Sequence, residues 1–377
     1  MPVQKIFIND FLEKAKALPL IDVRSPGEYS HAHIPNAQNL PLFTNDERKN
    51  VGTTYKQKSR EEAIKIALDY FGPKMRGMVE ETEAMLAVRR NIYDNTTKQK
   101  DDMHPTSNTV LIYCWRGGMR SAAVAWLLDV YGFKVYTLVG GYKAYRKWAL
   151  AQFEKKYPLH IIGGCTGSGK TLLLHELVKQ NKPAIDLEKL ANHKGSAFGA
   201  VGNQPSQEMF ENLLANSLFA IHGLLAVESS QIADSGQKAT IWIEDESQRI
   251  GNLQIPPAFW RTMRSNPVFY LDIPFEQRLD YITEVYSKTE KEKLVNSIIR
   301  IQKRLGGLDT KNAINHLLED NYKESFRILL RYYDKWYEKA LHNRENLSQL
   351  LNKIPCKNVD TAENLQKLIS CQALKTV

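Results

Sequence analysis

Residues 159–171 read Leu-His-Ile-Ile-Gly-Gly-Cys-Thr-Gly-Ser-Gly-Lys-Thr, an apolar run that leads into a glycine-rich turn. Gly164, four further residues and then Gly169-Lys170-Thr171 give the spacing of a phosphate-binding loop. The pattern predicts a strand at Leu159–Ile162 and a helix at Lys170–Lys179. In such a loop, backbone N–H groups converge on phosphate oxygens and the threonine hydroxyl can hold Mg²⁺. The predicted phosphate-binding residues are Gly164, Thr166, Gly167, Ser168, Gly169, Lys170 and Thr171, with Thr171 as the candidate Mg²⁺ ligand.

Three carboxylates stand together where the apolar run Thr240–Glu244 ends. We expect this run to be a strand, with further strands at Ala184–Asp186 and Val268–Asp272. An acid at the end of a strand beside the phosphate loop can support its metal ion or its phosphates. We expect such a role for one of the three, and the sequence leaves open which: Glu244, Asp245 or Glu246.

A second loop of chemical interest reads Cys114-Trp-Arg-Gly-Gly-Met-Arg120-Ser121. It lies between an expected strand, Thr109–Tyr113, and an expected helix, Arg120–Tyr131. Loop N–H groups and the helix N-terminus would surround the thiol with positive potential, which favours the reactive thiolate. Cys114 is therefore the candidate catalytic residue. The candidate anion-binding residues around it are Arg116, Gly117, Gly118 and Arg120.

Strands and helices alternate in both halves of the chain, which predicts the α/β class with mostly parallel sheets. The length of 377 residues suits two domains. The polar stretch Lys155–Pro158 marks a boundary, so we predict domains at 1–152 and 153–377. The second domain is expected to become helical and strongly charged after Phe275, with no further strand before Asn358–Asp360.

The first half contains additional expected elements. Strands are predicted at Leu20–Val23 and Lys134–Leu138, and helices at Arg60–Tyr70 and Met78–Tyr93. A polar run at 95–108 has the composition of a loop.

Composition restricts the class of protein and its partners. The chain carries 51 Lys and Arg against 42 Asp and Glu, a net charge of +9. This charge fits a polyanionic partner, with nucleic acid first and an anionic membrane surface second, as well as it fits a merely basic surface. Its four cysteines form no CxxC pair, which argues against a disulfide framework or a zinc site. We find neither a membrane-spanning apolar run nor a signal peptide, so we expect a cytoplasmic protein without membrane association.

Two stretches near the N-terminus carry a resemblance to a known family. Ile21–Tyr29 reads Ile-Asp-Val-Arg-Ser-Pro-Gly-Glu-Tyr, and His33–Pro41 reads His-Ile-Pro-Asn-Ala-Gln-Asn-Leu-Pro. Together they resemble the opening signature of rhodanese domains, whose sulfur- or selenium-carrying cysteine matches Cys114. The usual sulfurtransferase loop has four residues between Cys and Arg, whereas this loop has five, similar to related phosphatases. A phosphatase ranks low because the loop contains no acidic general acid.

A rhodanese domain followed by a P-loop domain resembles the bacterial tRNA 2-selenouridine synthase family, which also shows the five-residue spacing. The resemblance spans nearly the whole chain. It implies an N-terminal rhodanese-like parallel-sheet domain and a C-terminal P-loop NTPase-like α/β domain with a helical C-terminal region. The motifs that carry it are 114–121, Gly140–Arg146, Gly164–Thr171, His193–Gly199, Gln204–Glu208, Glu244–Gly251 and Arg304–Gly307.

The resemblance implies a transferase that replaces the sulfur of wobble 2-thiouridine in tRNA with selenium from selenophosphate. The sulfur is first alkylated with a geranyl group from geranyl diphosphate. The implied partners are tRNA and a selenophosphate-supplying enzyme, and no tightly bound cofactor is expected. The sequence does not decide whether the phosphate loop binds geranyl diphosphate, a nucleoside triphosphate or both.

Several side chains are candidates for the RNA or prenyl site. Tyr332, Tyr333, Trp336 and Tyr337 have helical spacing that favours a core role over base stacking. His193 and Phe198 are candidates for lining a prenyl or phosphate site. A charged helical region is a candidate tRNA-binding face, weighed equally against a solvated helix: Lys288, Lys291, Lys293, Arg300, Lys303 and Arg304.

Two other functions remain open at this point. One is a rhodanese sulfurtransferase with a nucleotide-binding regulatory domain, which would transfer sulfur from thiosulfate without regard to tRNA. The other is a nucleotide-dependent RNA-binding protein in which Cys114 is unreactive.

Overall fold

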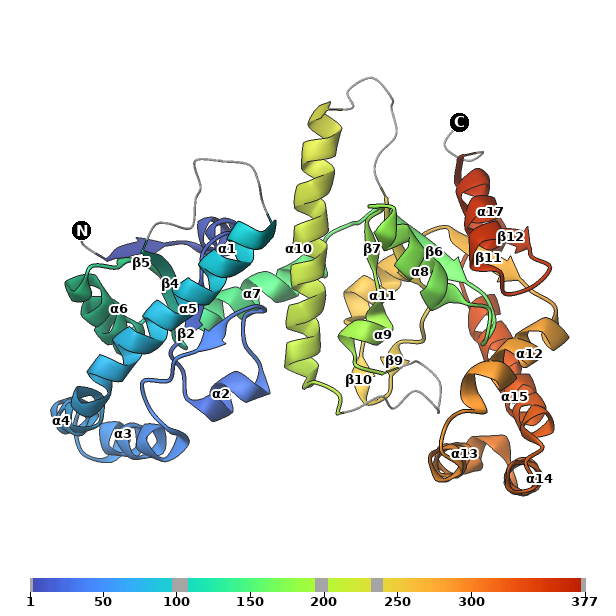
Figure 1. Ribbon diagram of the computed structural model, residues 1–377, viewed down its shortest axis with the longest axis horizontal. Coiled ribbons are helices and arrows are strands. Elements are labelled where there is room, and N and C mark those ends of the chain that lie inside the picture. The colour runs from blue at the N-terminus through green and yellow to red at the C-terminus, as the bar shows by residue number, and fades with distance from the viewer. Residues whose placement is uncertain (1–2, 97–107, 194–202, 232–239, 374–377) are drawn as a thin grey trace. The chain divides into compact units, whose positions relative to one another are not determined.

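The computed structural model describes residues 3–96, 108–193, 203–231 and 240–373 (Figure 1). The chain forms two compact units, Met1–Ala151 and Gln152–Val377. Each unit contains a five-stranded sheet in which every paired strand is parallel, so the expected α/β class is confirmed. Among the described residues, no helix is long and apolar enough to cross a membrane.

The first unit is built around a sheet with the strand order β1-β5-β4-β2-β3. Its central strand β4 is buried along its whole length, as its apolar and β-branched sequence requires. The helix α6 that follows ends at Gly132, whose left-handed backbone (φ 111°) closes the last turn. The elements are β1 (Gln4–Ile6), α1 (Ile8–Ala15), β2 (Leu20–Asp22), α2 (Pro26–His31), β3 (Gln38–Asn39), α3 (Asn45–Gln57), α4 (Arg60–Phe71), a 3₁₀ turn (Gly72–Lys74), α5 (Met75–Thr96), β4 (Thr109–Tyr113), α6 (Met119–Tyr131), β5 (Lys134–Leu138) and α7 (Gly141–Gln152).

The second unit has the strand order β12-β11-β6-β8-β7. The phosphate loop follows the central strand β6, so that neighbouring strands bring their carboxyl ends to the same edge. The elements are β6 (Leu159–Gly163), α8 (Lys170–Lys179), β7 (Ala184–Ile185), α9 (Leu187–Leu190), α10 (Gln207–Gln231), β8 (Ile241–Glu244), β9 (Arg249–Ile250), β10 (Leu253–Gln254), α11 (Pro257–Arg264), β11 (Val268–Asp272), α12 (Phe275–Tyr286), α13 (Lys291–Leu305), α14 (Gly307–Leu318), α15 (Tyr322–His342), α16 (Leu347–Leu350), β12 (Leu351–Pro355) and α17 (Thr361–Ala373).

Two apolar clusters of the second unit can be defined from its described residues. One lies around the sheet, where Ile162 and Phe269 pack with Leu174 of α8 and Leu368 of α17. The other joins the helices α12 to α15. The expected helical, charged region after Phe275 therefore folds around an apolar core of its own.

The last strand lies earlier in the chain than the sequence pattern predicted. Asn358–Asp360 is a turn, and Asp360 caps α17 by accepting the Glu363 N–H at 2.8 Å. The strand is Leu351–Pro355, which pairs with β11 at the edge of the sheet. An edge strand tolerates Pro355, and its short mixed sequence gave little strand signal.

Candidate functional site

The phosphate loop connects β6 to α8 with the expected strand–loop–helix order. Gly167 and Gly169 have φ angles of +80° and +75°, which favour glycine. A Cβ atom on Gly167 would also lie 2.6 Å from Cδ1 of Ile282, so this position leaves no room for a side chain. The ammonium group of Lys170 donates to the Gly164 carbonyl at 2.8 Å, across the mouth of the loop. These contacts give the loop a defined conformation.

An ion pair supports the loop from outside. The guanidinium of Arg278, on α12, donates to both carboxylate oxygens of Asp334, on α15, at 2.9 and 2.7 Å. The same guanidinium donates to the Thr166 carbonyl at 3.1 Å. Arg278 is buried and so fixes the loop against both helices with bidentate geometry.

A second buried network reaches the loop through Tyr337 of α15. Its hydroxyl accepts the Gly164 N–H at 3.0 Å and donates to Asp245 Oδ2 at 2.9 Å. Arg344 donates to the other oxygen of Asp245 at 2.7 Å, and its side chain is fully buried. Burial and the nearby charge of Asp245 raise the pKa of Tyr337 well above its usual value, so the hydroxyl keeps its proton.

Carboxylates gather around the hydroxyl of Thr171. Its Oγ1 lies 3.3 Å from Glu188 Oε2 and 3.5 Å from Glu244 Oε2. Carboxylate oxygens of Glu188, Glu244 and Glu246 all lie within 4.8 Å of one another. Burial, followed by the charges of Glu246 and Glu188, raises the pKa of Glu244 well above its usual value. Burial and Glu188 raise the pKa of Glu246 to about 8.

This cluster fits a divalent cation. Three crowded carboxylates and a hydroxyl are the hard oxygen ligands that Mg²⁺ prefers, and a cation would offset their mutual repulsion. Thr171 is the ligand that the sequence proposed, and Glu188, on α9, lies beside its hydroxyl.

The structure separates the three acids that the sequence left together. Glu244 and Glu246 belong to the carboxylate cluster beside Thr171. Asp245 instead binds Tyr337 and Arg344, and so helps to hold the loop.

The loop opens into a pocket of about 850 Å³ within the second unit. Loop residues 166–171 and the acids form one side, and helices α12 and α15 contribute an apolar and aromatic wall. Trp336, which the sequence favoured as a core residue, is 46% exposed and belongs to this wall, so that prediction is wrong. His193 also lines the pocket, whereas Phe198 lies outside the described residues. The wall residues are Tyr281, Ile282, Val285, Tyr286, Tyr332, Tyr333, Trp336, Tyr337, Ala340 and Leu341.

The cysteine loop of the first unit is closely packed. Cys114 follows β4 and is only 3% exposed, with its Sγ 3.2 Å from Ser121 Oγ. The Cys114 carbonyl accepts the Tyr142 N–H at 2.8 Å, which fixes the loop to the start of α7. A Cβ atom on Gly117 (φ +65°) would lie 2.5 Å from the Leu138 carbonyl oxygen. The Ser121 hydroxyl can donate to a thiolate, the reactive form of the cysteine.

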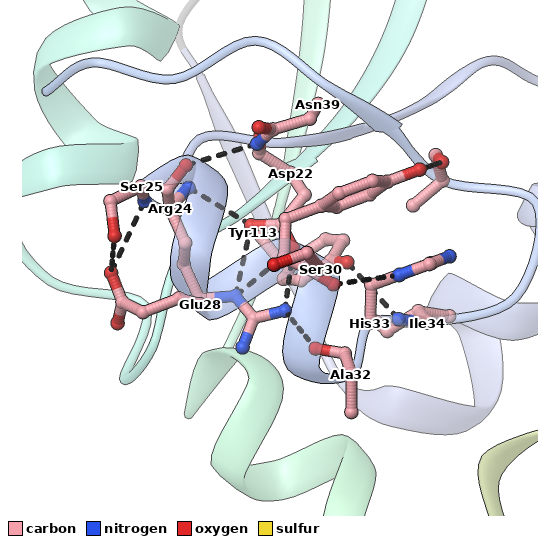
Figure 2. Close-up of polar contacts among 12 residues, drawn as sticks. Asp22, Arg24, Ser25, Glu28, Ser30, Ala32, His33, Ile34, Asn39 and Tyr113 are labelled. Atoms are coloured by element: carbon pink, nitrogen blue, oxygen red, sulfur yellow. Dashed lines mark hydrogen bonds and ion pairs between the residues drawn. The ribbon is translucent and has the colours of Figure 1, made fainter. Parts of the chain in front are cut away.

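A buried arginine supports the strand beside this loop (Figure 2). Arg24 is 1% exposed and donates to both oxygens of Asp22, with Nη2 to Oδ2 at 2.6 Å. Its guanidinium lies over the Tyr142 ring, 3.9 Å from the centroid. Arg24 thus joins β2, which carries the first signature residues, to α7. The first turn of α7 in turn binds the Cys114 carbonyl of the cysteine loop.

The two arginines of the cysteine loop differ in their surroundings. Arg120 donates to Glu28 at 2.7 and 3.3 Å, so its charge is already paired. Although burial opposes ionisation, Arg120 holds the pKa of Glu28 below its usual value. Arg116 is exposed, and no ion pair joins it to a carboxylate in the part of the chain described. Arg116 is therefore the more available of the two cations that the sequence proposed.

The six candidate RNA-binding cations lie on or next to α13. Lys291 pairs with Asp320 at 2.7 Å, and Lys293 pairs with Glu290 at 3.0 Å. Lys288, Arg300 and Lys303 are exposed. Arg304 is exposed as well, and it alone of the six lines the pocket at the phosphate loop. An RNA-binding role for this group stays a prediction.

Sequence reasoning missed residues that reach the loop from far along the chain. Glu188 lies three residues after the end of β7, so the convergence of parallel strand ends was a usable signal for it. Arg278, Asp334, Tyr337 and Arg344 gave no such signal, because only the packing of α12 and α15 brings them to the loop.

Comparison with known proteins identifies both units. Residues 157–353 match the family described as tRNA 2-selenouridine synthase AAA domain, and residues 8–147 match the rhodanese-like domain family. Three relatives are each named tRNA 2-selenouridine synthase. The one from Sulfurovum sp. is 32% identical over 367 residues, covering 88% of this chain and 91% of the relative. That from Hydrogenovibrio crunogenus is 33% identical over 363 residues, with the same shares. That from Nitrosomonas europaea is 35% identical over 276 residues, which cover 72% of this chain and 64% of the relative. The chain belongs to the tRNA 2-selenouridine synthase family.

Proposed function

We propose that this protein replaces the sulfur of wobble 2-thiouridine in tRNA with selenium from selenophosphate, through an S-geranyl intermediate made from geranyl diphosphate. The observation that carries the proposal is the pocket of the second unit, where a phosphate loop adjoins an apolar wall. A prenyl diphosphate has these two parts joined in one molecule. The names of the relatives support tRNA as the substrate.

The position of Ile282 supports a prenyl donor. This residue touches the phosphate loop at Gly167 and lies on α12 next to Val285 along the same pocket wall. A hydrocarbon chain attached to a diphosphate in the loop would therefore continue directly onto apolar surface. Each buried CH₂ group contributes about 0.8 kcal/mol, so this wall selects a prenyl chain over a polar substituent.

In the first step, the thiouridine sulfur attacks C1 of the geranyl group and diphosphate leaves. Lys170 and the N–H groups of the loop stabilise the charge that develops on the leaving oxygen. Thr171 with Glu188, Glu244 and Glu246 would hold Mg²⁺, which supplies further positive charge to the diphosphate. Tyr337 and Arg278 keep the loop in place during the step.

In the second step, the selenium of selenophosphate adds to C2 of the S-geranylated base and geranylthiol leaves, because alkylated sulfur is a better leaving group than unalkylated sulfur. Hydrolysis of the P–Se bond then releases phosphate. Cys114 is required for this transfer, and Arg116 with the loop backbone binds the selenophosphate anion. A separate enzyme supplies selenophosphate. The positive charge of the chain supplies contacts to RNA phosphates, with the cations near α13 as candidates.

Mass analysis of nucleosides tests the proposal. Thiolated tRNA and pre-geranylated tRNA are each incubated with selenophosphate, geranyl diphosphate and either Cys114→Ser or Lys170→Ala enzyme. The Cys114 variant should accumulate S-geranyl nucleoside from thiolated tRNA and form no selenouridine. The Lys170 variant should modify only pre-geranylated tRNA. Cys371→Ser and Lys179→Ala serve as matched controls, because neither residue belongs to the cysteine loop or the pocket.

Two outcomes would overturn parts of the proposal. Selenouridine formation by the Cys114 variant at the control rate would remove that cysteine from the reaction. Normal selenation of thiolated tRNA by the Lys170 variant would show that the phosphate loop is not needed for an alkylation step. Calorimetry with ATP beside geranyl diphosphate then distinguishes a nucleotide site from a prenyl diphosphate site.

A further inference from the structure

The α11 side of the phosphate pocket is not explained by a prenyl diphosphate. This side contributes Trp260 and Arg264, whereas the loop and the wall of α12 and α15 already provide for both parts of the donor. If the proposed alkylation takes place here, the thiouridine sulfur must approach the donor carbon to about 3–3.5 Å. The nucleoside must therefore enter the same pocket. A volume of about 850 Å³ is near the upper end for small-molecule pockets.

The charge of Arg264 is offset only in part by a neighbouring carboxylate. Arg264 is half-buried at the end of α11, and its guanidinium lies over the Trp260 ring, 5.2 Å from the centroid. No ion pair joins it to an acid within the described ranges. Burial and the like charge of Arg344 lower the pKa of Arg264, so a further anion nearby would stabilise its guanidinium. Asp245, the nearest acid, is already bound by Arg344 and Tyr337.

Buried donors without a partner also lie on this side of the unit, although Arg344 itself does not line the pocket. Nε and Nη1 of Arg344 are buried without a hydrogen-bond partner among the described residues, as is Nε1 of Trp260. Buried donors of this kind cost about 1–3 kcal/mol each when they are unpaired. Arg304 adds another cation to the pocket lining, from α13.

We propose that Arg264 and Arg304 bind backbone phosphates of the RNA next to the target nucleoside, with Trp260 positioning the Arg264 guanidinium. This inference rests on the proposed function, because it assumes that the nucleoside meets its alkyl donor in this pocket. The donor then occupies the loop and the wall of α12 and α15, and the nucleotide enters along α11. The diphosphate of the donor is the other source of phosphate that these arginines could bind.

Binding measurements separate the two sources. Arg264→Gln and Arg304→Gln are compared with Arg261→Gln, an exposed residue on the same helix as Arg264, and with Lys311→Gln, an exposed residue on α14. Affinity is measured for a 2-thiouridine anticodon stem-loop over a range of salt concentrations and, separately, for geranyl diphosphate. We expect the RNA affinity of each pocket variant to fall about tenfold or more, as it does when a charge-assisted hydrogen bond is removed. The slope of the logarithm of the RNA binding constant against the logarithm of the salt concentration should become shallower by about 0.7 for each phosphate that the variant no longer binds.

The controls should retain wild-type RNA affinity, and all four variants should retain their affinity for geranyl diphosphate. In geranylation assays of Arg264→Gln and Arg304→Gln, KM for RNA should rise while KM for geranyl diphosphate stays constant. A fall in donor affinity that equals the loss in RNA affinity would assign the arginines to the diphosphate. RNA affinities equal to those of the controls would refute the inference. RNA binding is measured without alkylation. Failure of the proposed chemistry can therefore be distinguished from failure of the RNA-binding inference. The unfolding temperature of Arg264→Gln should not decrease, since the substitution removes repulsion from Arg344.

Discussion

The cysteine loop and the phosphate loop share one plan but differ in how open they are. Both follow the central part of a parallel sheet and lead into a helix, and both contain glycines at positive φ. The Cys114 thiol is 3% exposed, and its loop is packed against the start of α7. The phosphate loop instead faces a large pocket, and the ammonium group of its lysine donates to a backbone carbonyl.

This difference suits the two loops to different anions. The closed loop has room for a small anion at its backbone N–H groups. The open loop, with Lys170 and an apolar wall, has room for an anion that carries a large substituent. The contacts that hold each loop in place differ as well. The cysteine loop is held by close packing at its glycines, and the phosphate loop by the buried networks of Arg278 and Tyr337.

The largest effect should come from filling the closed loop. A Cβ atom on Gly141 (φ +57°) would overlap the Cys114 carbonyl oxygen and the Gly117 nitrogen. We expect Gly141→Ala to destabilise the first unit by about 4 kcal/mol or more and to abolish selenation, while geranyl diphosphate binding persists. Gly52→Ala, on α3 and outside the cysteine loop, is the control, since nothing lies near its Cβ position. Unfolding curves and calorimetry measure both effects, and equal behaviour of the two variants would contradict the packing argument.

Neutralising adjacent acids should separate support from cation binding. Asp245→Asn leaves Arg344 buried beside an uncharged partner, so we expect a loss of about 3–5 kcal/mol in unfolding free energy. Glu246→Gln should preserve or increase stability because it relieves repulsion within the carboxylate cluster. The same variant should weaken Mg²⁺ binding by about tenfold. Denaturant unfolding and Mg²⁺ titration test this pair, and equal destabilisation by both substitutions would argue against it.

Removing the lysine of the open loop should affect binding and leave the fold intact. Lys170→Ala should weaken geranyl diphosphate binding by about 1.5–3 kcal/mol, the range for charge-assisted hydrogen bonds. Lys179→Ala, at the other end of α8, should bind as the wild type does. Titration calorimetry measures this difference. Unchanged affinity in Lys170→Ala would place the diphosphate elsewhere.

The smallest effect concerns acid sensitivity. Burial lowers the pKa of His160, on β6, to about 4, whereas the pKa of a histidine in an unfolded chain is about 6.5. The unfolded chain therefore binds more protons between these values. Stability of the second unit should fall as the pH drops from about 6.5 to about 4, by on the order of 1 kcal/mol after allowing for partial solvent exposure. His160→Gln should remove this slope, as followed by hydrogen exchange of β6.

The first unit should respond in a lower pH range. The depressed pKa of Glu28 means that its contribution is present above about 4.5 and is lost as the pH falls through the folded-state value. A shared loss of stability starting near pH 6.5 in both units would contradict the assignment to His160.

The sequence predicted both loops because each lies within a short segment where strand, turn and helix signals agree. The order of β6, loop and α8 depends on local residues alone, as does that of β4, Cys114 and α6. The supports of the phosphate loop were not predictable in this way. Tyr337 has the spacing of a core helix residue, and only the folded chain shows its hydroxyl at Gly164.

The sequence also predicted the last strand at the wrong position, at Asn358–Asp360 instead of Leu351–Pro355, for a related reason. Leu351–Pro355 has no continuous apolar run, because an edge strand buries less of its surface than a central one. The amide nitrogen of Asn352 also bonds the Val268 carbonyl at 3.2 Å, an interaction that helps to define the strand and leaves no mark on local sequence.

The position of β12 has a consequence for protein synthesis. This strand pairs with β11, which in turn pairs with β6, the strand that leads into the phosphate loop. During synthesis, β12 therefore leaves the ribosome after all the remaining strands of the two five-stranded sheets. The first unit can fold during translation, whereas the second must wait for residues 351–355. A chain interrupted before this point would carry a folded cysteine loop in its first unit and an incomplete sheet under the phosphate loop in its second.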